Sequence, residues 1–220
     1  MQSAKLNFPS ESEQVITQTI LLTQNASLTY DLLAATSAGE EVSMPGFCKF
    51  FRLCSLRTRK MSERWINWLV MRGGKLQISE INPLYPAGDI LQQGIEKLLS
   101  YALETEKKLE QQMRYVHQVA RSKGDLATAE FIENKFLPQQ IYVIRMMVNF
   151  VNGLRVSQNA YIYDRTTVME FTKKIHKSLL ERHQMLGGSD LFNEDFKPSG
   201  WSMPQVNNSI MITAFIYPID

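Results

Sequence analysis

The chain has 220 residues, of which 44% are hydrophobic and 21% charged, and its formal net charge is +2. This size and composition indicate a globular protein with one sizeable core, and exclude a disordered or fibrous chain. A net charge so near zero gives no general attraction to nucleic acid. The first ten residues, MQSAKLNFPS, lack the apolar core of a signal peptide, and no apolar run is long enough to span a membrane. We therefore expect a cytoplasmic protein without a membrane partner.

Apolar residues recur at helical spacing over most of the chain. The pattern predicts helices at about 10–38, 45–72, 93–122, 125–152 and 159–168. The connections are short, except for a long crossover between the second and third helices that holds two prolines. Four long helices joined in this way predict an all-α four-helix bundle with one long crossover, followed by a short fifth helix.

The end of the chain differs from the rest. We predict one domain over residues 1–168 and an irregular C-terminal extension over residues 169–220, because glycines and prolines interrupt the later pattern. The extension ends in the apolar run IMITAFIY (210–217), which needs a surface to pack on.

Short stretches along the chain resemble the ferritin family. They are ASLTY (26–30), MRGGK (71–75), LETEK (103–107), FIENKFL (131–137) with Gln140, and YIYDR (161–165). The likeness covers nearly all of residues 12–168, in order and at compatible spacing. It implies a ferritin-like bundle whose subunits self-assemble, in a 24-subunit cage of octahedral symmetry.

Many ferritins oxidise iron at two adjacent metal sites inside the bundle, where carboxylates and an imidazole converge. The resemblance places the first of these glutamates at Thr23, and the Glu-x-x-His pair of the second helix at Thr58 and Met61. Two hydroxyls and a thioether suit iron poorly. We therefore predict that the ferroxidase centre is degenerate.

Part of the family's ligand set is retained at Tyr30, Glu106 and Gln140. One carboxylate and one amide cannot balance two divalent ions in a buried site. We expect Glu106 to hydrogen-bond to Tyr30 or Gln140, or to pair with a neighbouring lysine. The chain is then not an enzyme and requires no cofactor, although iron at low occupancy stays compatible with it.

The stretch LRTRKMSERW (56–65) is strongly basic. In the family, acids on the cavity side of the second helix nucleate the iron mineral, and the resemblance places two of them at Arg57 and Lys60. A positive patch there repels ferric ions and attracts anions. We predict a basic cavity-side patch that is either solvated or salt-bridged. Binding of RNA or other phosphates is the alternative, but we do not expect nucleic acid inside a closed shell.

The family's channels give two further sets of positions. Glu130 and Glu133, with His117 nearby, match the acids that line the threefold pore and attract cations. A solvated helix face is the other interpretation of the same acids. Ile162 and Thr166 match positions that face the fourfold channel.

The combined pattern resembles the iron-silent, artemin-like members of the family, which have a similar Arg-rich stretch and a long C-terminal extension. Those members are rich in cysteine, whereas this chain has only Cys48 and Cys54. The resemblance implies a structural, storage or stress and chaperone-type role. The alternative is a non-catalytic iron-storage subunit that co-assembles with a ferroxidase-competent ferritin chain. Whether the extension lies inside or outside the cage is left open by the sequence.

Overall fold

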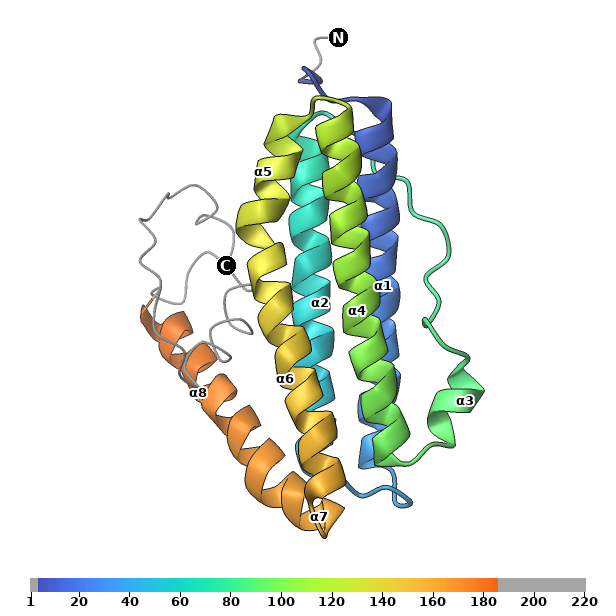
Figure 1. Cartoon of the computed structure of the whole chain (residues 1–220), viewed down its shortest axis with the longest axis vertical. Helices are drawn as coiled ribbons and strands as arrows, with labels where there is room; N and C mark the ends of the chain where they lie inside the picture. Colours follow the sequence, from blue (N-terminus) through green and yellow to red (C-terminus); the bar gives the residue numbers. More distant parts are fainter. Residues whose placement is uncertain (1–3, 186–220) are drawn as a thin grey trace.

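The computed structural model describes residues 4–185, with side chains to residue 179, and this part of the chain is all-helical. The bundle consists of α1 (Ser10–Ala38), α2 (Pro45–Met71), α4 (Ile95–Ser122), α5 (Leu126–Lys135) and α6 (Leu137–Val156). The crossover between α2 and α4 carries the short α3 (Ala87–Leu91). Figure 1 shows α5 and α6 end to end as the fourth rod of the bundle. The predicted fold, an all-α bundle with one long crossover, is confirmed.

The fourth helix was predicted as one segment over residues 125–152, and this is wrong. The structure breaks it at Phe136, whose φ of −123° and ψ of −53° depart from helical geometry. Pro138 follows in the first turn of α6. Proline has no backbone N–H, so the hydrogen bond that would tie residue 138 to the preceding turn cannot form.

The predicted end of the fifth helix at residue 168 is also wrong. α7 (Ala160–Tyr163) and the π-helical turn η1 (Asp164–Val168) lead directly into α8 (Met169–Met185). Phe171, Ile175 and Leu179 repeat every four residues and give α8 one apolar side. Residues 169–185 are therefore helical, although they were predicted to belong to an irregular extension. The rest of the predicted extension, including the apolar run 210–217, lies outside the described residues.

Two hydrophobic clusters fill the bundle. One lies toward the α7 end and includes Phe47, Phe50 and Phe150, while the other includes Trp65 and Phe136. Buried polar side chains accompany these clusters on α1, α2, α4 and α6, at positions where a simple core would hold aliphatic residues. They form the candidate site.

Candidate functional site

A buried ion pair occupies the interior of the bundle. The side chain of Arg57 is 1% exposed and that of Glu106 0% exposed, and an Arg57 Nη2–Glu106 Oε1 contact joins them. The Tyr30 hydroxyl also donates a hydrogen bond to Glu106 Oε1. Gln140 Nε2 donates to Glu106 Oε2 at 2.6 Å and to the Glu106 backbone oxygen at 3.0 Å. Arg57 Nη1 approaches Gln140 Oε1 at 3.4 Å. We call these four side chains the central network.

Four helices of the bundle each supply one member of the central network. Tyr30 comes from α1, Arg57 from α2, Glu106 from α4 and Gln140 from α6. Gln140 lies on the first turn of α6, where its backbone N–H bonds to the oxygen of Phe136 at 3.0 Å. The break at Phe136 therefore lies directly before the helical turn that carries the side-chain amide of Gln140.

The electrostatics of the central network are set by burial and by the charge of Glu106. Burial and the Glu106 carboxylate both raise the pKa of Tyr30 well above its ordinary value, so the phenol stays protonated and donates. Burial alone would lower the pKa of Arg57, but the Glu106 carboxylate leads the effects that outweigh burial and raise the pKa overall. Burial also raises the pKa of the Cys54 thiol. The guanidinium is therefore a permanent positive charge in the bundle.

Arg57 was predicted to belong to a basic patch on the cavity side, and the structure places it inside the bundle instead. A signal for this was present in the sequence. Cys54, Met61 and Trp65 are all buried on α2, and Arg57 lies three residues after the first and four before the second. Its position on the helix therefore belongs to the core face. The charge of Arg57 suggested a surface position, but the carboxylate of Glu106 on α4 pairs with it and so permits its burial.

The positions that replace family iron ligands are buried as well. The Thr23 hydroxyl donates to the backbone oxygens of Thr19 at 3.0 Å and Ile20 at 2.8 Å, within its own helix. The Thr58 hydroxyl donates in the same way to Cys54 and Ser55, both at 3.0 Å. Met61 is 3% exposed and packs in the cluster around Trp65. These side chains are used in helix bonding and packing.

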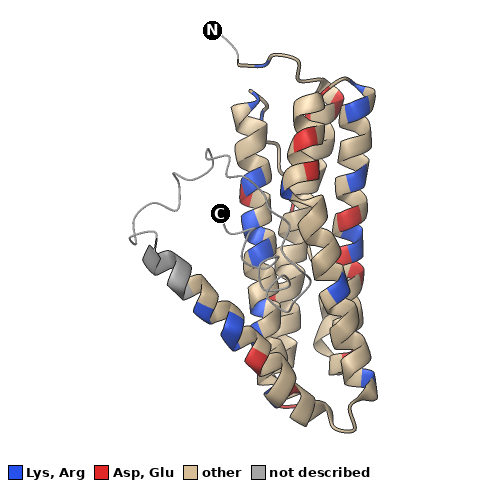
Figure 2. Ribbon diagram, turned by 60° about the vertical axis from the view of Figure 1, so that its left-hand side comes forward, with Lys and Arg blue, Asp and Glu red and all other residues tan. Residues whose placement is uncertain are grey.

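Lys60, the other predicted member of the basic patch, is partly exposed and pairs with Glu63 at 2.8 Å. Arg59 pairs with Asp31 of α1 at 3.3 Å. Figure 2 shows basic residues along the bundle and on α8, and α2 alone carries six, with Glu63 as its one acid. The positive charge of the predicted patch is thus lower than expected. Arg57 is buried in an ion pair, and Lys60 and Arg59 each pair with an acid at the surface.

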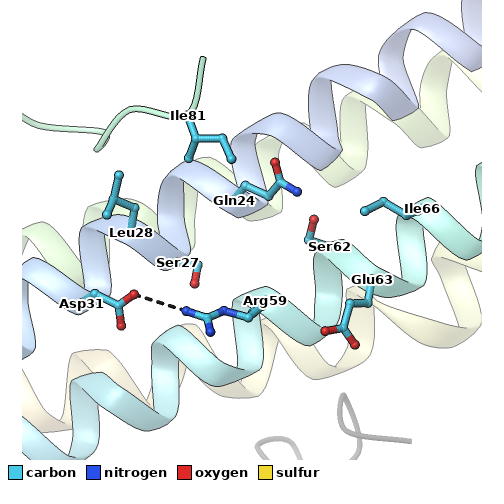
Figure 3. A pocket seen from close by; sticks show the side chains of 9 residues that line it. All are labelled: Gln24, Ser27, Leu28, Asp31, Arg59, Ser62, Glu63, Ile66 and Ile81. Carbon is cyan, nitrogen blue, oxygen red and sulfur yellow. Dashed lines mark hydrogen bonds and ion pairs between the residues drawn. The ribbon is translucent and has the colours of Figure 1, made fainter. Parts of the chain in front are cut away.

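The Arg59–Asp31 pair borders an open groove between α1 and α2, of about 470 Å³. Figure 3 shows Ile81 of the crossover at one side and Ser62 and Glu63 of α2 at the other. The Ser62 hydroxyl is buried and lacks a hydrogen-bond partner among the described residues. The groove is separate from the central network, because none of the four network residues lines it.

The predicted pore acids Glu130 and Glu133 lie on α5, and His117 lies near the end of α4. His117 Nε2 and Glu133 Oε1 are 2.5 Å apart, and Arg121 Nη2 lies 3.6 Å from the same oxygen. Glu130 is exposed one turn before Glu133. The structure therefore brings His117 and Glu133 together and adds Arg121, a cation that the sequence analysis did not single out.

The predicted fourfold-channel positions lie on the turn formed by α7 and η1. Ile162 is 58% exposed, and the hydroxyl of Thr166, also exposed, donates to the Ile162 backbone oxygen at 2.7 Å. The two side chains are one turn apart on the same helix face. That face is open in the single chain.

Two negative findings concern the part of the chain that the structure describes. Among the side chains of residues 4–179, those of His, Cys, Asp and Glu nowhere gather in threes as a metal site would need. Over the same residues, none of the helices is both long and apolar enough to cross a bilayer.

This connectivity, with polar side chains from α1, α2, α4 and α6 meeting in the interior, is typical of a ferritin-like protein. The sequence matches the ferritin family, described as a ferritin-like domain, over residues 16–156. The chain therefore belongs to the ferritin family.

Individual proteins named as ferritins are also similar to this chain. The chain is 29% identical to a protein named soma ferritin from Lymnaea stagnalis over 171 residues, which cover 76% of this chain and 97% of the relative. It is 31% identical to ferritin-1, chloroplastic, from Pisum sativum over 153 residues, or 69% of this chain and 60% of the relative. It is 30% identical to ferritin-4, chloroplastic, from Arabidopsis thaliana over 158 residues, with 69% and 59% covered.

Proposed function

We propose that this chain is a cage subunit that neither oxidises iron at a diiron centre nor nucleates a mineral, and that it has a structural, storage or stress-related role of the artemin-like type. The observation that supports this is the Arg57–Glu106 pair. Glu106 is the carboxylate that the family uses for iron, and here its charge is balanced by a guanidinium of the same chain.

The residues present do not fit a pair of iron ions. The central network offers one carboxylate, one amide and one protonated phenol, and its cation is permanent. A second cation beside Arg57 would meet direct repulsion in a site of low dielectric constant. Thr23 and Thr58 already donate their hydroxyl protons to backbone oxygens of their own helices. We therefore expect no iron oxidation at the central network.

The test is an aerobic iron assay on the purified assembly. Fe²⁺ is added in small increments, and ferric absorbance and oxygen consumption are followed against buffer alone. We expect no oxidation above the buffer rate. A matched gain-of-function variant combines Thr23→Glu, Arg57→Gln, Thr58→Glu and Met61→His, which restores the carboxylates and imidazole and removes the guanidinium. Rapid oxidation by the unmodified chain would overturn the proposal.

Assembly is the second part of the proposal. Ferritin family proteins typically self-assemble into cages, and we propose a 24-subunit shell for this chain. Native mass spectrometry of the purified protein measures the subunit number directly. A stable monomer or dimer under native conditions would rule out this part. Cytoplasmic localisation stays a prediction, which imaging of the tagged chain in its own cells tests.

The alternative function is that of a non-catalytic subunit beside a ferroxidase-competent chain. The exposed acids Glu130 and Glu133 favour it, because acids at these positions attract cations. Mass spectrometry of cages isolated from the native tissue decides between the two. Cages that contain a second ferritin chain support the alternative, and cages of this chain alone exclude it.

A further inference from the structure

The N-terminal segment of the chain is docked across one end of the bundle. Figure 1 shows it at the end where α2 finishes and α5 begins. The side chain of Phe8 is 5% exposed. Lys5 Nζ lies 2.5 Å from one carboxylate oxygen of Glu13 on α1, and the other oxygen accepts a hydrogen bond from the Lys75 backbone N–H at 2.8 Å. We call residues 4–8 the N-terminal clamp.

A glycine turn at the end of α2 makes room for the N-terminal clamp. Gly73 has a φ of +76°, in the left-handed region that favours glycine. A Cβ at this position would also lie 2.7 Å from the backbone nitrogen of Lys5, which is closer than real atoms approach. Glycine is therefore needed here for two reasons, the conformation of the turn and the passage of the N-terminal clamp.

Arg72, directly before this turn, connects the N-terminal clamp to α5. Its Nη2 donates a hydrogen bond to the Asn7 backbone oxygen at 2.8 Å, and its Nη1 donates to Asp125 Oδ1 at 3.1 Å. The guanidinium also lies over the ring of Phe8, 5.0 Å from its centroid, and over that of Trp68, at 5.6 Å. The donors of a guanidinium point in fixed directions, so contacts on one side restrict the geometry on the other.

Asp125 depends on this guanidinium. Its side chain is fully buried and caps α5, because Oδ1 accepts a hydrogen bond from the Thr128 backbone N–H at 3.2 Å. Its Oδ2 has no hydrogen-bond partner among the described residues. A buried carboxylate is costly unless a cation pairs with it, and Arg72 is the cation in contact with it. The cap of α5 is therefore coupled to the position of Arg72.

α5 is the element that this coupling should affect most. It has ten residues and is set off from its neighbours by the turn at Gly124 and the break at Phe136. An isolated helix of this length is marginal in water, so contacts with the rest of the chain decide its stability. It carries the exposed acids Glu130 and Glu133, the second of which contacts His117 of α4.

We propose that the N-terminal clamp controls how firmly α5 is held. Docking of residues 4–8 fixes the guanidinium of Arg72, and Arg72 in turn holds the Asp125 cap, so the stability of α5 and of its exposed acids depends on the N-terminal clamp. Arg72 is then a positioning residue, because it acts on α5 through the Asp125 carboxylate. The clamp, Arg72 and α5 contribute no side chain to the central network, so this inference is independent of the iron-silent proposal.

The first test is hydrogen exchange of the full-length assembled protein, read by mass spectrometry. Phe8→Ala removes the ring beside the guanidinium and leaves Arg72 and Asp125 in place. We expect the amides of α5 to exchange about tenfold faster, while those of α6 change little. Leu6→Ala is the matched control, because this side chain of the same segment is 76% exposed. Unchanged exchange in α5, or an equal acceleration in α6, would overturn the proposal.

The second test separates coupling through Arg72 from simple packing of Phe8. Asparagine also caps helices well, so Asp125→Asn keeps the cap of α5 and removes the charge that pairs with Arg72. In the Asp125→Asn background, Phe8→Ala should accelerate exchange in α5 by less than about threefold, because the two substitutions act on the same link. The same acceleration in both backgrounds would show that Phe8 acts by packing alone, which refutes the proposal.

A gentler variant covers the case in which Phe8→Ala does not fold. Phe8→Leu keeps an apolar side chain and lacks the ring face over which the guanidinium lies. We expect about threefold faster exchange in α5 with Asp125 present, and no acceleration in the Asp125→Asn background. Equal exchange changes in the two backgrounds, or none in either, refute the proposal as well.

Discussion

The interior ion pair and the α8 end of the bundle use opposite chemistry to hold helices together. Arg57 and Glu106 carry full charges in an environment without water, whereas Phe50, Phe150 and Phe171 make only apolar ring contacts. Breaking a buried ion pair is costly, because either partner alone is an uncompensated charge. Each ring contact contributes only about 0.5–1.5 kcal/mol beyond the area that it buries. The interior should therefore fail abruptly when one residue changes, and the α8 end should open locally.

The largest effect is expected for Arg57→Ala. Removing one partner of a buried pair costs about 3–5 kcal/mol of the free energy of unfolding. Chemical denaturation monitored by circular dichroism measures this loss. Arg59→Ala is the matched control, because its pair with Asp31 is exposed and contributes at most about 1 kcal/mol. Equal losses for the two variants would contradict the interpretation of the interior.

A double substitution sharpens the same point. Arg57→Leu combined with Glu106→Leu removes both charges, and it should recover most of the stability that Arg57→Ala loses, since apolar replacement of buried pairs is often neutral or favourable. A double variant as unstable as Arg57→Ala would show that volume and not charge dominates there.

Tyr30→Phe should have the next largest effect. The hydroxyl donates to the Glu106 carboxylate and lies 3.3 Å from the Ala102 backbone oxygen. A hydrogen bond to a charged group contributes about 1.5–3 kcal/mol, and this variant leaves the ring packing intact. Tyr115→Phe, at a ring that is 50% exposed, is the control and should change stability little. Thermal and denaturant unfolding of both variants tests the expectation.

Gly46→Ala tests the α8 end. The added methyl group would clash with Asp164, and overpacking of this kind costs about 1–3 kcal/mol. We expect the cost to appear as local opening, with faster hydrogen exchange in η1 and α8 and unchanged protection around Glu106. Gly88→Ala in α3 is the control, because its added Cβ would have no atom within 4 Å apart from its chain neighbours and its own helix backbone. Faster exchange throughout the bundle would contradict the separation of the two regions.

The sequence predicted the bundle because periodic apolar residues and glycine or proline stops are local signals. It did not predict the break at Phe136, because Pro138 was counted inside a helix pattern that otherwise continued. It missed α8 beyond residue 168 for a related reason. An amphipathic stripe of Phe171, Ile175 and Leu179 is short, and only the aromatic rings of α2 and α6 make it worth burying.

The central network could be predicted in part. Glu106 was expected to hydrogen-bond to Tyr30 or Gln140, or to pair with a neighbouring lysine. In the structure it bonds to both Tyr30 and Gln140, and its cationic partner is Arg57. The role of Arg57 was missed, since a basic residue on a basic helix suggests the surface. Whether it is buried depends on a carboxylate far away in sequence, 49 residues along the chain.

The smallest expected effect concerns Glu11, an exterior residue in the first turn of α1. A hydrogen bond from Lys123 lowers the pKa of Glu11 to about 2 from an ordinary value near 4.5. The unfolded chain therefore takes up this proton first as pH falls. The contribution of Glu11 to stability is complete above pH 4.5 and is lost as pH falls toward 2. NMR titration of the Glu11 carboxyl measures its pKa, and Lys123→Met should return it toward the ordinary value. Because the Glu11–Lys123 pair is exposed, added salt should weaken the shift of the Glu11 pKa. Salt should affect the buried Arg57–Glu106 pair much less. A Glu11 pKa that stays low in the Lys123 variant would show that the local backbone is the cause.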